Sequence, residues 1–178
     1  MMTDERPKNY AETVREVVEN RVCLKFSPKD KIPDIIARMH AHGGGVGGVV
    51  NEAGKFIGFI TEREIVRSAF GTATNMQERL DFISNQKSSE DKTAWDIMIA
   101  SADTLHPEDH IEDAVDVIDY FGYRYMPVVD SQNNLIGIAD ARELHRHDRI
   151  RAKNFLETKD SMLSYVMGTE PYGKGASF

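Results

Sequence analysis

Apolar positions along this chain change repeatedly from a helical to an extended pattern. The clearest helical pattern places Ile32, Ile35, Ile36 and Met39 at spacings i, i+3, i+4 and i+7, which share one face of a helix. Two short apolar runs separated by a polar turn follow it, and such runs are typical of a pair of strands. The pattern therefore predicts a helix followed by a hairpin.

The same succession of patterns returns later in the chain. The helical spacing recurs 79 residues further on, at Ile111, Ala114, Val115 and Ile118. The segment Val49–Arg67, VVNEAGKFIGFITEREIVR, aligns without a gap on Val128–Arg146, VVDSQNNLIGIADARELHR, at the same offset of 79. A fixed offset over this length indicates two copies of one unit.

The ends of these elements carry suitable residues. Asp30 and Asp109 are placed to cap the main helix of each copy, and Gly43 and Gly122 are placed to end it, because glycine adopts the left-handed conformation at little cost. The expected strands are Val46–Val50 and Phe56–Ile60, then Tyr125–Val129 and Leu135–Ala139. A helix is expected after each hairpin, the second running to about Lys153. Helices covering a small mixed sheet give an α+β fold with α/β-like character.

We therefore divide the chain into five segments. They are an N-terminal tail (1–12), the first copy (13–71), a linker (72–92), the second copy (93–154) and a C-terminal tail (155–178). The linker is expected to contain a helix, because Met76, Leu80 and Ile83 share a helical face. A single copy of about 60 residues would bury little surface, so the two copies are expected to share a core.

Composition and charge narrow the classes of function. The 178 residues carry a formal net charge of −7, which argues against nucleic acid as a partner. No apolar run reaches the roughly 20 residues needed to span a bilayer, and the first ten residues lack the apolar core of a signal peptide. We expect a cytoplasmic protein with no membrane partner. The single cysteine, Cys23, is expected to be a small buried side chain.

Other patterns add little chemistry. Residues 43–48, GGGVGG, satisfy G-x-G-x-x-G, but a helix precedes them and a strand follows, the reverse of a dinucleotide-binding unit. They are expected to form a connection that lets a ligand or a neighbouring backbone approach. The histidines lack a third ligand at metal spacing, so no metal site is expected. The basic run from Arg142 to Lys153 is either a solvated mixed-charge face or a contact surface for phosphate or an acidic partner. Without a nucleophile–base pair or a P-loop, catalysis is not expected.

The strand-to-helix segments resemble those of cystathionine-β-synthase (CBS) domains, whose signature is Gly-h-h-Thr/Ser-x-x-Asp with h apolar. The first copy reads Gly58-Phe59-Ile60-Thr61-Glu62-Arg63-Glu64, and the second reads Gly137-Ile138-Ala139-Asp140-Ala141-Arg142-Glu143. Because both signatures are in register with the helices and hairpins, residues 14 to 147 resemble a tandem CBS pair, or Bateman module, of the stand-alone bacterial kind.

The resemblance implies a ligand and the residues that hold it. An adenosine-containing molecule (AMP, ADP or ATP, or else NADH or S-adenosylmethionine) would bind in the cleft between the copies as an effector, with no cofactor required. The first site would comprise Val46, Gly47, Gly48, Thr61, Arg63, Glu64 and Arg67. The second would comprise Thr104, Tyr125, Met126, Pro127, Asp140, Arg142 and Glu143. Hydroxyls and carboxylates suit ribose, and arginines suit phosphate.

The chain departs from the family pattern at the chemical positions. Glu64 and Glu143 stand where aspartate is usual, and Asp140 stands where threonine or serine is usual and would repel a phosphate. Gly47 and Gly48 replace a Met-Pro-like pair, so a roomy base pocket is expected. The first site, with Thr61 and its arginines, is expected to suit a phosphate-bearing ligand better.

Two hypotheses follow from these residues. The chain is a non-catalytic regulatory module that senses an adenosine-containing ligand, or it is a dimerisation or docking scaffold that no longer binds nucleotide. The resemblance implies a homodimer under either hypothesis, and the output must pass through another protein, which the sequence does not identify.

Overall fold

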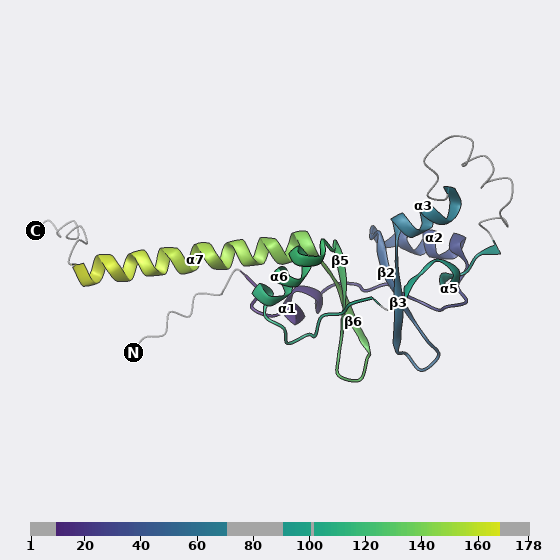
Figure 1. Cartoon of the computed structure of the whole chain (residues 1–178), viewed down its shortest axis with the longest axis horizontal. Coiled ribbons are helices and arrows are strands. Elements are labelled where there is room, and N and C mark those ends of the chain that lie inside the picture. Colours follow the sequence, from purple (N-terminus) through teal and green to yellow (C-terminus); the bar gives the residue numbers. More distant parts are fainter. Residues whose placement is uncertain (1–9, 71–90, 101, 168–178) are drawn as a thin grey trace, which may run out of the picture.

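The computed structural model of the chain describes residues 10–70, 91–100 and 102–167 (Figure 1). The elements in the first half are α1 (Val14–Val18), β1 (Lys25–Phe26), α2 (Ile32–His42), β2 (Val46–Val50), β3 (Phe56–Thr61) and α3 (Glu62–Phe70). Those in the second half are α5 (Ala94–Ile97), β4 (Ile99–Ala100), α6 (Ile111–Phe121), β5 (Tyr125–Val129), β6 (Leu135–Asp140) and α7 (Ala141–Met167). The helix expected between Met76 and Ile83 lies outside the described residues.

The internal repeat predicted from the sequence is also a structural repeat. Val46 pairs with Thr61 in the first antiparallel hairpin, and Tyr125 pairs with Asp140 in the second. Both hairpins shift register at the same point, after Val49 and after Val128. The 79-residue offset therefore preserves strand pairing as well as sequence pattern.

The sheet of the first copy is small and mixed, as predicted. Its strand order is β1-β2-β3-β4, in which β1 and β2 are parallel and the other neighbours are antiparallel. The sheet of the second copy has β5 and β6, and a parallel bridge between Leu105 and Val128 extends it. Ile35 and Met39 of α2 pack under the first sheet, and Ile111 and Ile118 of α6 pack under the second.

The short segment that opens each copy packs on the other copy. Val14 and Val18 of α1 belong to the core of the second copy, together with Leu105 and Ile118. In return, Ala94 of α5 joins the core of the first copy, and β4 pairs with β3. Order along the sequence assigns α1 to the first copy and α5 to the second, so the sequence did not indicate this exchange.

The first glycine of each signature segment makes room for the exchanged segment. A Cβ atom on Gly137 would lie 2.6 Å from Cβ of Val18 in α1. On Gly58 it would lie 2.7 Å from the carbonyl oxygen of Ile99 in β4. No side chain fits at such distances, so these glycines serve the packing between the copies.

The ends of the main helices agree only in part with the prediction. Gly43 and Gly122 end α2 and α6 in the left-handed conformation, with φ of 63° and 70°. The prediction that Asp30 and Asp109 are N-caps is wrong, because Lys31 and His110 hold that position. The aspartates instead close the preceding turn: Asp30 accepts a hydrogen bond from the Ser27 amide at 3.0 Å, and Asp109 accepts one from the His106 amide at 2.7 Å.

The last helix is longer than the sequence pattern indicated. We expected it to end near Lys153, but α7 continues to Met167 and includes the first part of the segment assigned to a C-terminal tail. Its first turns pack on α6, where Arg151 pairs with Glu112 and His145 pairs with Asp119. Figure 1 shows its yellow-green end passing beyond the other described elements. Within the described ranges, no helix combines the length and apolarity needed to cross a membrane.

Candidate functional site

The two copies meet along their hairpins. Phe56 and Phe59 of β3 form a buried cluster with Leu135 of β6. Backbone and side chain of Asn133 hold the turn of the second hairpin against Phe56: the Phe56 amide donates to the Asn133 carbonyl at 3.0 Å, and Asn133 Nδ2 donates to the Phe56 carbonyl at 2.9 Å. We call this contact the seam.

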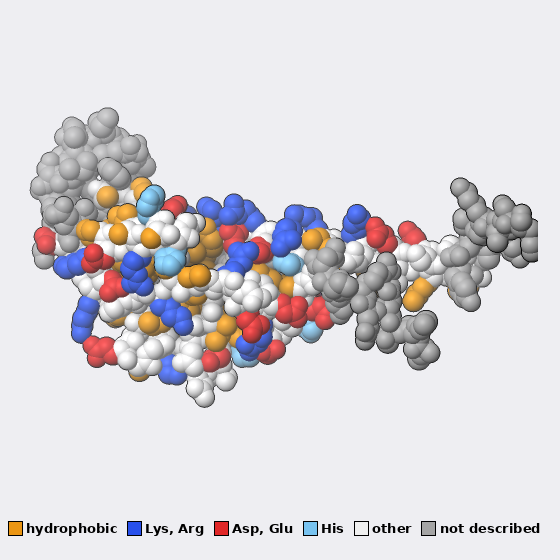
Figure 2. All heavy atoms as spheres, turned by 180° about the vertical axis from the view of Figure 1, so that it is seen from behind, with side chains coloured by type: hydrophobic (Ala, Val, Ile, Leu, Met, Phe, Trp, Pro, Cys, Tyr) orange, Lys and Arg blue, Asp and Glu red, His pale blue; other side chains and the backbone are white. Residues whose placement is uncertain are grey.

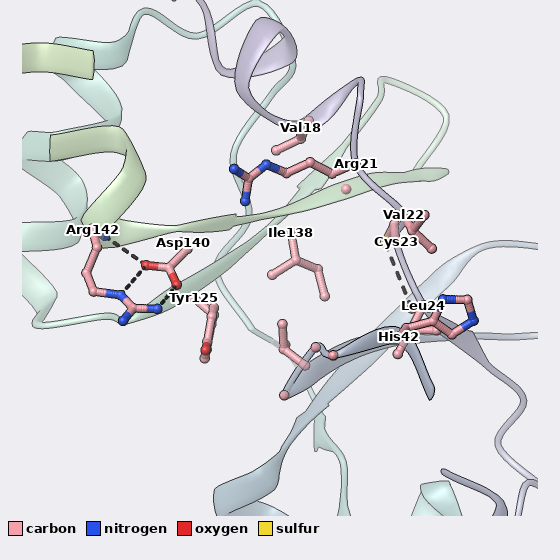
Figure 3. Close-up of a pocket in the computed structure, with 15 residues that line it drawn as sticks. Val18, Arg21, Val22, Cys23, Leu24, His42, Tyr125, Ile138, Asp140 and Arg142 are labelled. Carbon is pink, nitrogen blue, oxygen red and sulfur yellow. Dashed lines mark hydrogen bonds and ion pairs between the residues drawn. The ribbon is translucent and has the colours of Figure 1, made fainter. Parts of the chain in front are cut away.

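A cavity of about 270 Å³ lies at one end of the seam, between the copies (Figure 3). Its walls from the first half of the chain are Val18, Arg21–Leu24 and His42–Val46. Its walls from the second half are Tyr125, Gly137, Ile138, Asp140 and Arg142. We call it the seam cavity, and because both copies line it, a ligand bound there would touch both.

Asp140 and Arg142 form a closed ion pair on the wall of the seam cavity (Figure 3). Arg142 Nη2 lies 2.8 Å from Asp140 Oδ2, and the Arg142 amide donates to Oδ1 at 2.9 Å. The hydrogen bond from the Arg142 side chain holds the pKa of the Asp140 carboxyl below its ordinary value. The charge expected to repel a phosphate is therefore accompanied by a cation whose side chain is 75% exposed.

Glu143 is also paired, and its partner comes from the other end of the chain. The Arg21 guanidinium forms an ion pair with the Glu143 carboxylate, and Arg146 Nη2 lies 3.7 Å away from it. Arg21 lies between α1 and β1 and lines the seam cavity. Sequence reasoning missed Arg21, because it belongs to neither signature and is 122 residues from Glu143.

The polar residues of the first predicted site bind one another rather than lining the seam cavity. The Thr61 hydroxyl donates to the Glu64 carboxylate, and the Thr61 amide donates to Glu64 Oε2 at 3.3 Å. Arg67 Nη1 lies 3.9 Å from Glu64, whose side chain is buried, whereas Arg63 and Arg67 are exposed. This arrangement is a capping box at the start of α3. Val46 is the member of the first predicted site that lines the seam cavity.

The expectation of a roomy base pocket beside Gly47 and Gly48 is wrong. A Cβ on Gly47 would lie 2.3 Å from Cε2 of Phe26, and one on Gly48 would lie 2.2 Å from Cδ2 of Leu135. Neighbouring side chains already fill the space that the missing side chains leave. The open stretch is upstream, at Gly43 and Gly44, where a Cβ would meet nothing within 4 Å.

The second predicted site is brought together in part. Tyr125, Asp140 and Arg142 line the seam cavity. Met126 and Pro127 are buried in the second copy, and Thr104 is exposed on the approach to Leu105. The seam cavity thus combines one member of the first predicted set with three of the second.

Two further wall residues were not among the predicted site residues. Cys23 lies half-buried at the seam cavity, and burial raises the pKa of its thiol, so the neutral form is favoured. Gly44 and Gly45 belong to the glycine run expected to let a ligand approach, and that run was the one signal for this wall. No group of three or more potential metal ligands occurs in the part of the chain that the structure describes.

Comparison with known proteins addresses the repeat directly. A family model described as the CBS domain matches residues 14–71 and 94–149, which are more than half of the chain. An uncharacterized protein of Methanopyrus kandleri is 29% identical over 127 residues, or 71% of this chain. The match spans 58% of that relative's length.

Solved structures share the fold at low sequence identity. The CBS domain of a CBS-domain-containing membrane protein from Sphaerobacter thermophilus has a TM-score of 0.62 at 21% identity, covering 76% of this chain and 87% of that one. CBSX2 in complex with AMP, a CBS-pair protein of Arabidopsis thaliana, has a TM-score of 0.60 at 20% identity, with coverages of 80% and 99%. The CBS-domain pair of protein MJ0100, in complex with 5′-methylthioadenosine and S-adenosyl-L-methionine, has a TM-score of 0.59 at 18% identity, with coverages of 77% and 94%.

Proposed function

This chain belongs to the CBS-domain family and contains a tandem pair of such domains, and we propose that it is a non-catalytic regulatory module that senses an adenosine-containing ligand in the seam cavity. The observation that carries the proposal is the composition of that cavity, to which both copies contribute. A ligand that touches both copies can alter how they sit against each other, by at most its difference in affinity for the two arrangements.

The size and lining of the seam cavity suit a nucleoside with an anionic tail. Its volume of about 270 Å³ is close to the roughly 300 Å³ at which small-molecule pockets begin. Val46, Ile138 and the Tyr125 ring offer apolar surface for a base, and the Arg124 guanidinium stacks 4.9 Å from the centre of that ring. Arg21 and Arg142 offer guanidinium groups to a phosphate.

The identity of the ligand is left to AMP, ADP, ATP, NADH and S-adenosylmethionine. CBSX2 has been solved with AMP, and the pair of protein MJ0100 with S-adenosyl-L-methionine and 5′-methylthioadenosine, which supports adenosine as the shared part. Micromolar binding corresponds to about 8 kcal/mol, enough to bias a packed seam. A partner protein that recognises one arrangement would carry the output.

Calorimetric titration of the full chain with each of these ligands, together with adenosine, tests the proposal. We expect binding of at least one, and at 100 times its dissociation constant the ligand should stabilise the fold by about 2.7 kcal/mol. Arg142→Met should weaken the phosphate-bearing ligands more than adenosine. Arg149→Met, an exposed arginine of the same helix outside the seam cavity, is the matched control. Absence of heat and of thermal shift with every ligand would overturn the proposal.

A second candidate is a dimerisation or docking scaffold, and the pairing of charges at the seam cavity favours it. The carboxylates of Asp140 and Glu143 are both already occupied by arginines of the same chain. A groove of about 520 Å³ along α2 and α3 exposes Ile36 and Val66, a surface suited to an identical copy. We propose a homodimer through this groove under either function.

Light scattering on the full chain distinguishes the two functions. A scaffold keeps the mass of an assembly of 20.1 kDa chains with or without nucleotide and shows no binding heat. Ile36→Glu should lower that mass, whereas Ala37→Glu, an exposed neighbour on α2, should not. A chain that is monomeric before substitution would contradict the homodimer but would leave the ligand proposal standing.

A further inference from the structure

The outer half of α7, residues 154–167, is an apolar helix that the rest of the described chain leaves uncovered. Its large apolar side chains each expose between 44% and 80% of their surface: Phe155, Leu156, Met162, Leu163, Val166 and Met167. Figure 1 shows this part of α7 extending past α6 and α1. Single exposed apolar residues are ordinary, but a contiguous set on one element marks a contact surface.

These side chains form one stripe along the helix. Phe155, Met162 and Val166 follow the spacing i, i+7, i+11, and Leu156 and Leu163 run beside them. A shallow groove of about 340 Å³ confirms the shared face, because Phe155, Lys159, Met162 and Val166 all line it. Short helices are marginal without tertiary packing, so a stripe of this kind needs an occupant.

The charges beside the stripe have a direction along the helix. Lys153, Glu157 and Asp160 follow i, i+4, i+7 and so occupy one edge of the stripe, basic at its start and acidic further on. Lys153 Nζ lies 3.7 Å from Glu157 within the helix. When an identical helix runs antiparallel, the same edges meet in opposite directions, and Lys153 of each copy faces Asp160 of the other. A parallel pair would place like charges together.

We propose that the outer halves of α7 from two copies of this chain pair antiparallel, with their apolar stripes in contact. The Lys153–Asp160 contacts occur twice because a two-fold axis relates the copies. Burying most of the six apolar side chains removes on the order of 600 Å² per copy, near the roughly 800 Å² per partner of stable interfaces. This contact differs from the groove on α2 and α3, so the two contacts together link four chains.

Sedimentation velocity of the full chain tests the pairing, with Ile36→Glu in the background to remove association through the groove. Adding Met162→Glu and Val166→Glu should halve the mass, because a carboxylate in the stripe has no partner there. Adding Ser161→Glu, an exposed position on the opposite side of α7, should leave the mass unchanged. An equal mass for the stripe variant and the control overturns the proposal.

Charge exchange tests the orientation. Lys153→Glu and Asp160→Lys should each weaken the pairing several-fold, and the double variant should restore it, because the two contacts are then rebuilt with reversed sign. Failure of the double variant to recover overturns the antiparallel arrangement. Vesicles of anionic phospholipid provide the remaining arm: binding that needs Met162 and Val166, by a chain that stays monomeric, assigns the stripe to a membrane surface and overturns pairing. Ligand binding at the seam cavity should be unchanged throughout, so the two proposals fail separately.

Discussion

The side chain that is missing at position 47 sets the distance between β2 and the core of the first copy. Phe26 is fully buried, and its ring stands where the Cβ of residue 47 would be. The chain therefore uses glycine here for packing, whereas the same residue type at position 44 borders the open seam cavity. Two glycines of one run have different roles, and burial separates them.

We predict that Gly47→Ala lowers the free energy of unfolding by about 1–3 kcal/mol, since the added methyl overpacks the core. Gly44→Ala is the matched control, because nothing lies within 4 Å of its Cβ, and it should change stability by no more than about 0.5 kcal/mol. Urea denaturation measures both. Equal values for the two variants would contradict the packing role.

A histidine on α7 makes the attachment of the N-terminal segment sensitive to pH. The Ala11 amide donates to Nδ1 of His147 at 2.8 Å, which requires that nitrogen to be unprotonated. Burial, followed by the charge of Arg146, lowers the pKa of His147 below its ordinary value of 6.5. Because the folded-state pKa is the lower one, the contribution of His147 is complete above 6.5 and is lost as the pH falls through the folded-state pKa.

We predict that His147→Ala destabilises the protein by about 1 kcal/mol at neutral pH, the typical contribution of one hydrogen bond. The difference between wild type and variant should shrink as the pH falls through the folded-state pKa of His147. Denaturation curves of both proteins at a series of pH values measure it. A difference that is constant with pH, or that grows in acid, would rule out this contact as the cause.

At the scale of the element, the start of α3 shows one motif serving the local fold. The Thr61-x-x-Glu64 spacing places a carboxylate where it caps the first turn, and the structure contains those hydrogen bonds. The equivalent Glu143 at the start of α7 instead pairs with Arg21. A signature shared by two helices thus acts within one element in the first copy and between elements in the second.

We predict that Glu64→Ala lowers the free energy of unfolding by about 0.5–2 kcal/mol, through loss of the cap. Glu62→Ala, which removes an exposed carboxylate from the same turn, should have a smaller effect. Thermal unfolding followed by circular dichroism compares them. If Glu64→Ala abolishes ligand binding without loss of stability, the residue is a ligand group and not a cap.

At the scale of the whole molecule, the exchange of α1 and α5 makes each copy part of the other's core. Val14 and Val18 complete the second core, and Ala94 completes the first. The cluster of Phe56, Phe59 and Leu135 adds a third contact across the seam. Neither copy retains its full core when the other unfolds.

We predict that the two copies unfold in a single transition. Ile118→Ala, in the core of the second copy, should cost about 2–5 kcal/mol and should shift the fluorescence of Trp95, which lies on α5 beside the first copy, as much as it shifts the circular dichroism. Urea titrations with both probes provide the measurement. A Trp95 transition that stays in place while the circular dichroism moves would show that the copies unfold independently.

The sequence alone determined the features that depend on local spacing. The i, i+3, i+4, i+7 sets fixed α2 and α6, and Gly43 and Gly122 fixed their ends, because helix geometry and the left-handed conformation of glycine act within a few residues. The offset of 79 residues fixed the repeat and, through it, the family. None of these inferences needed to know what a residue touches elsewhere in the chain.

Only the tertiary structure decided which side chains meet across the seam. It brought Val46 to Tyr125, Asp140 and Arg142, added Arg21 to the same cavity, and tied Thr61 to Glu64 away from it. It also showed that α1 packs on the second copy, because a short apolar helix is buried wherever space is complementary and no local pattern specifies which core offers it. Sequence spacing specifies elements, and the packing of distant elements specifies the candidate site.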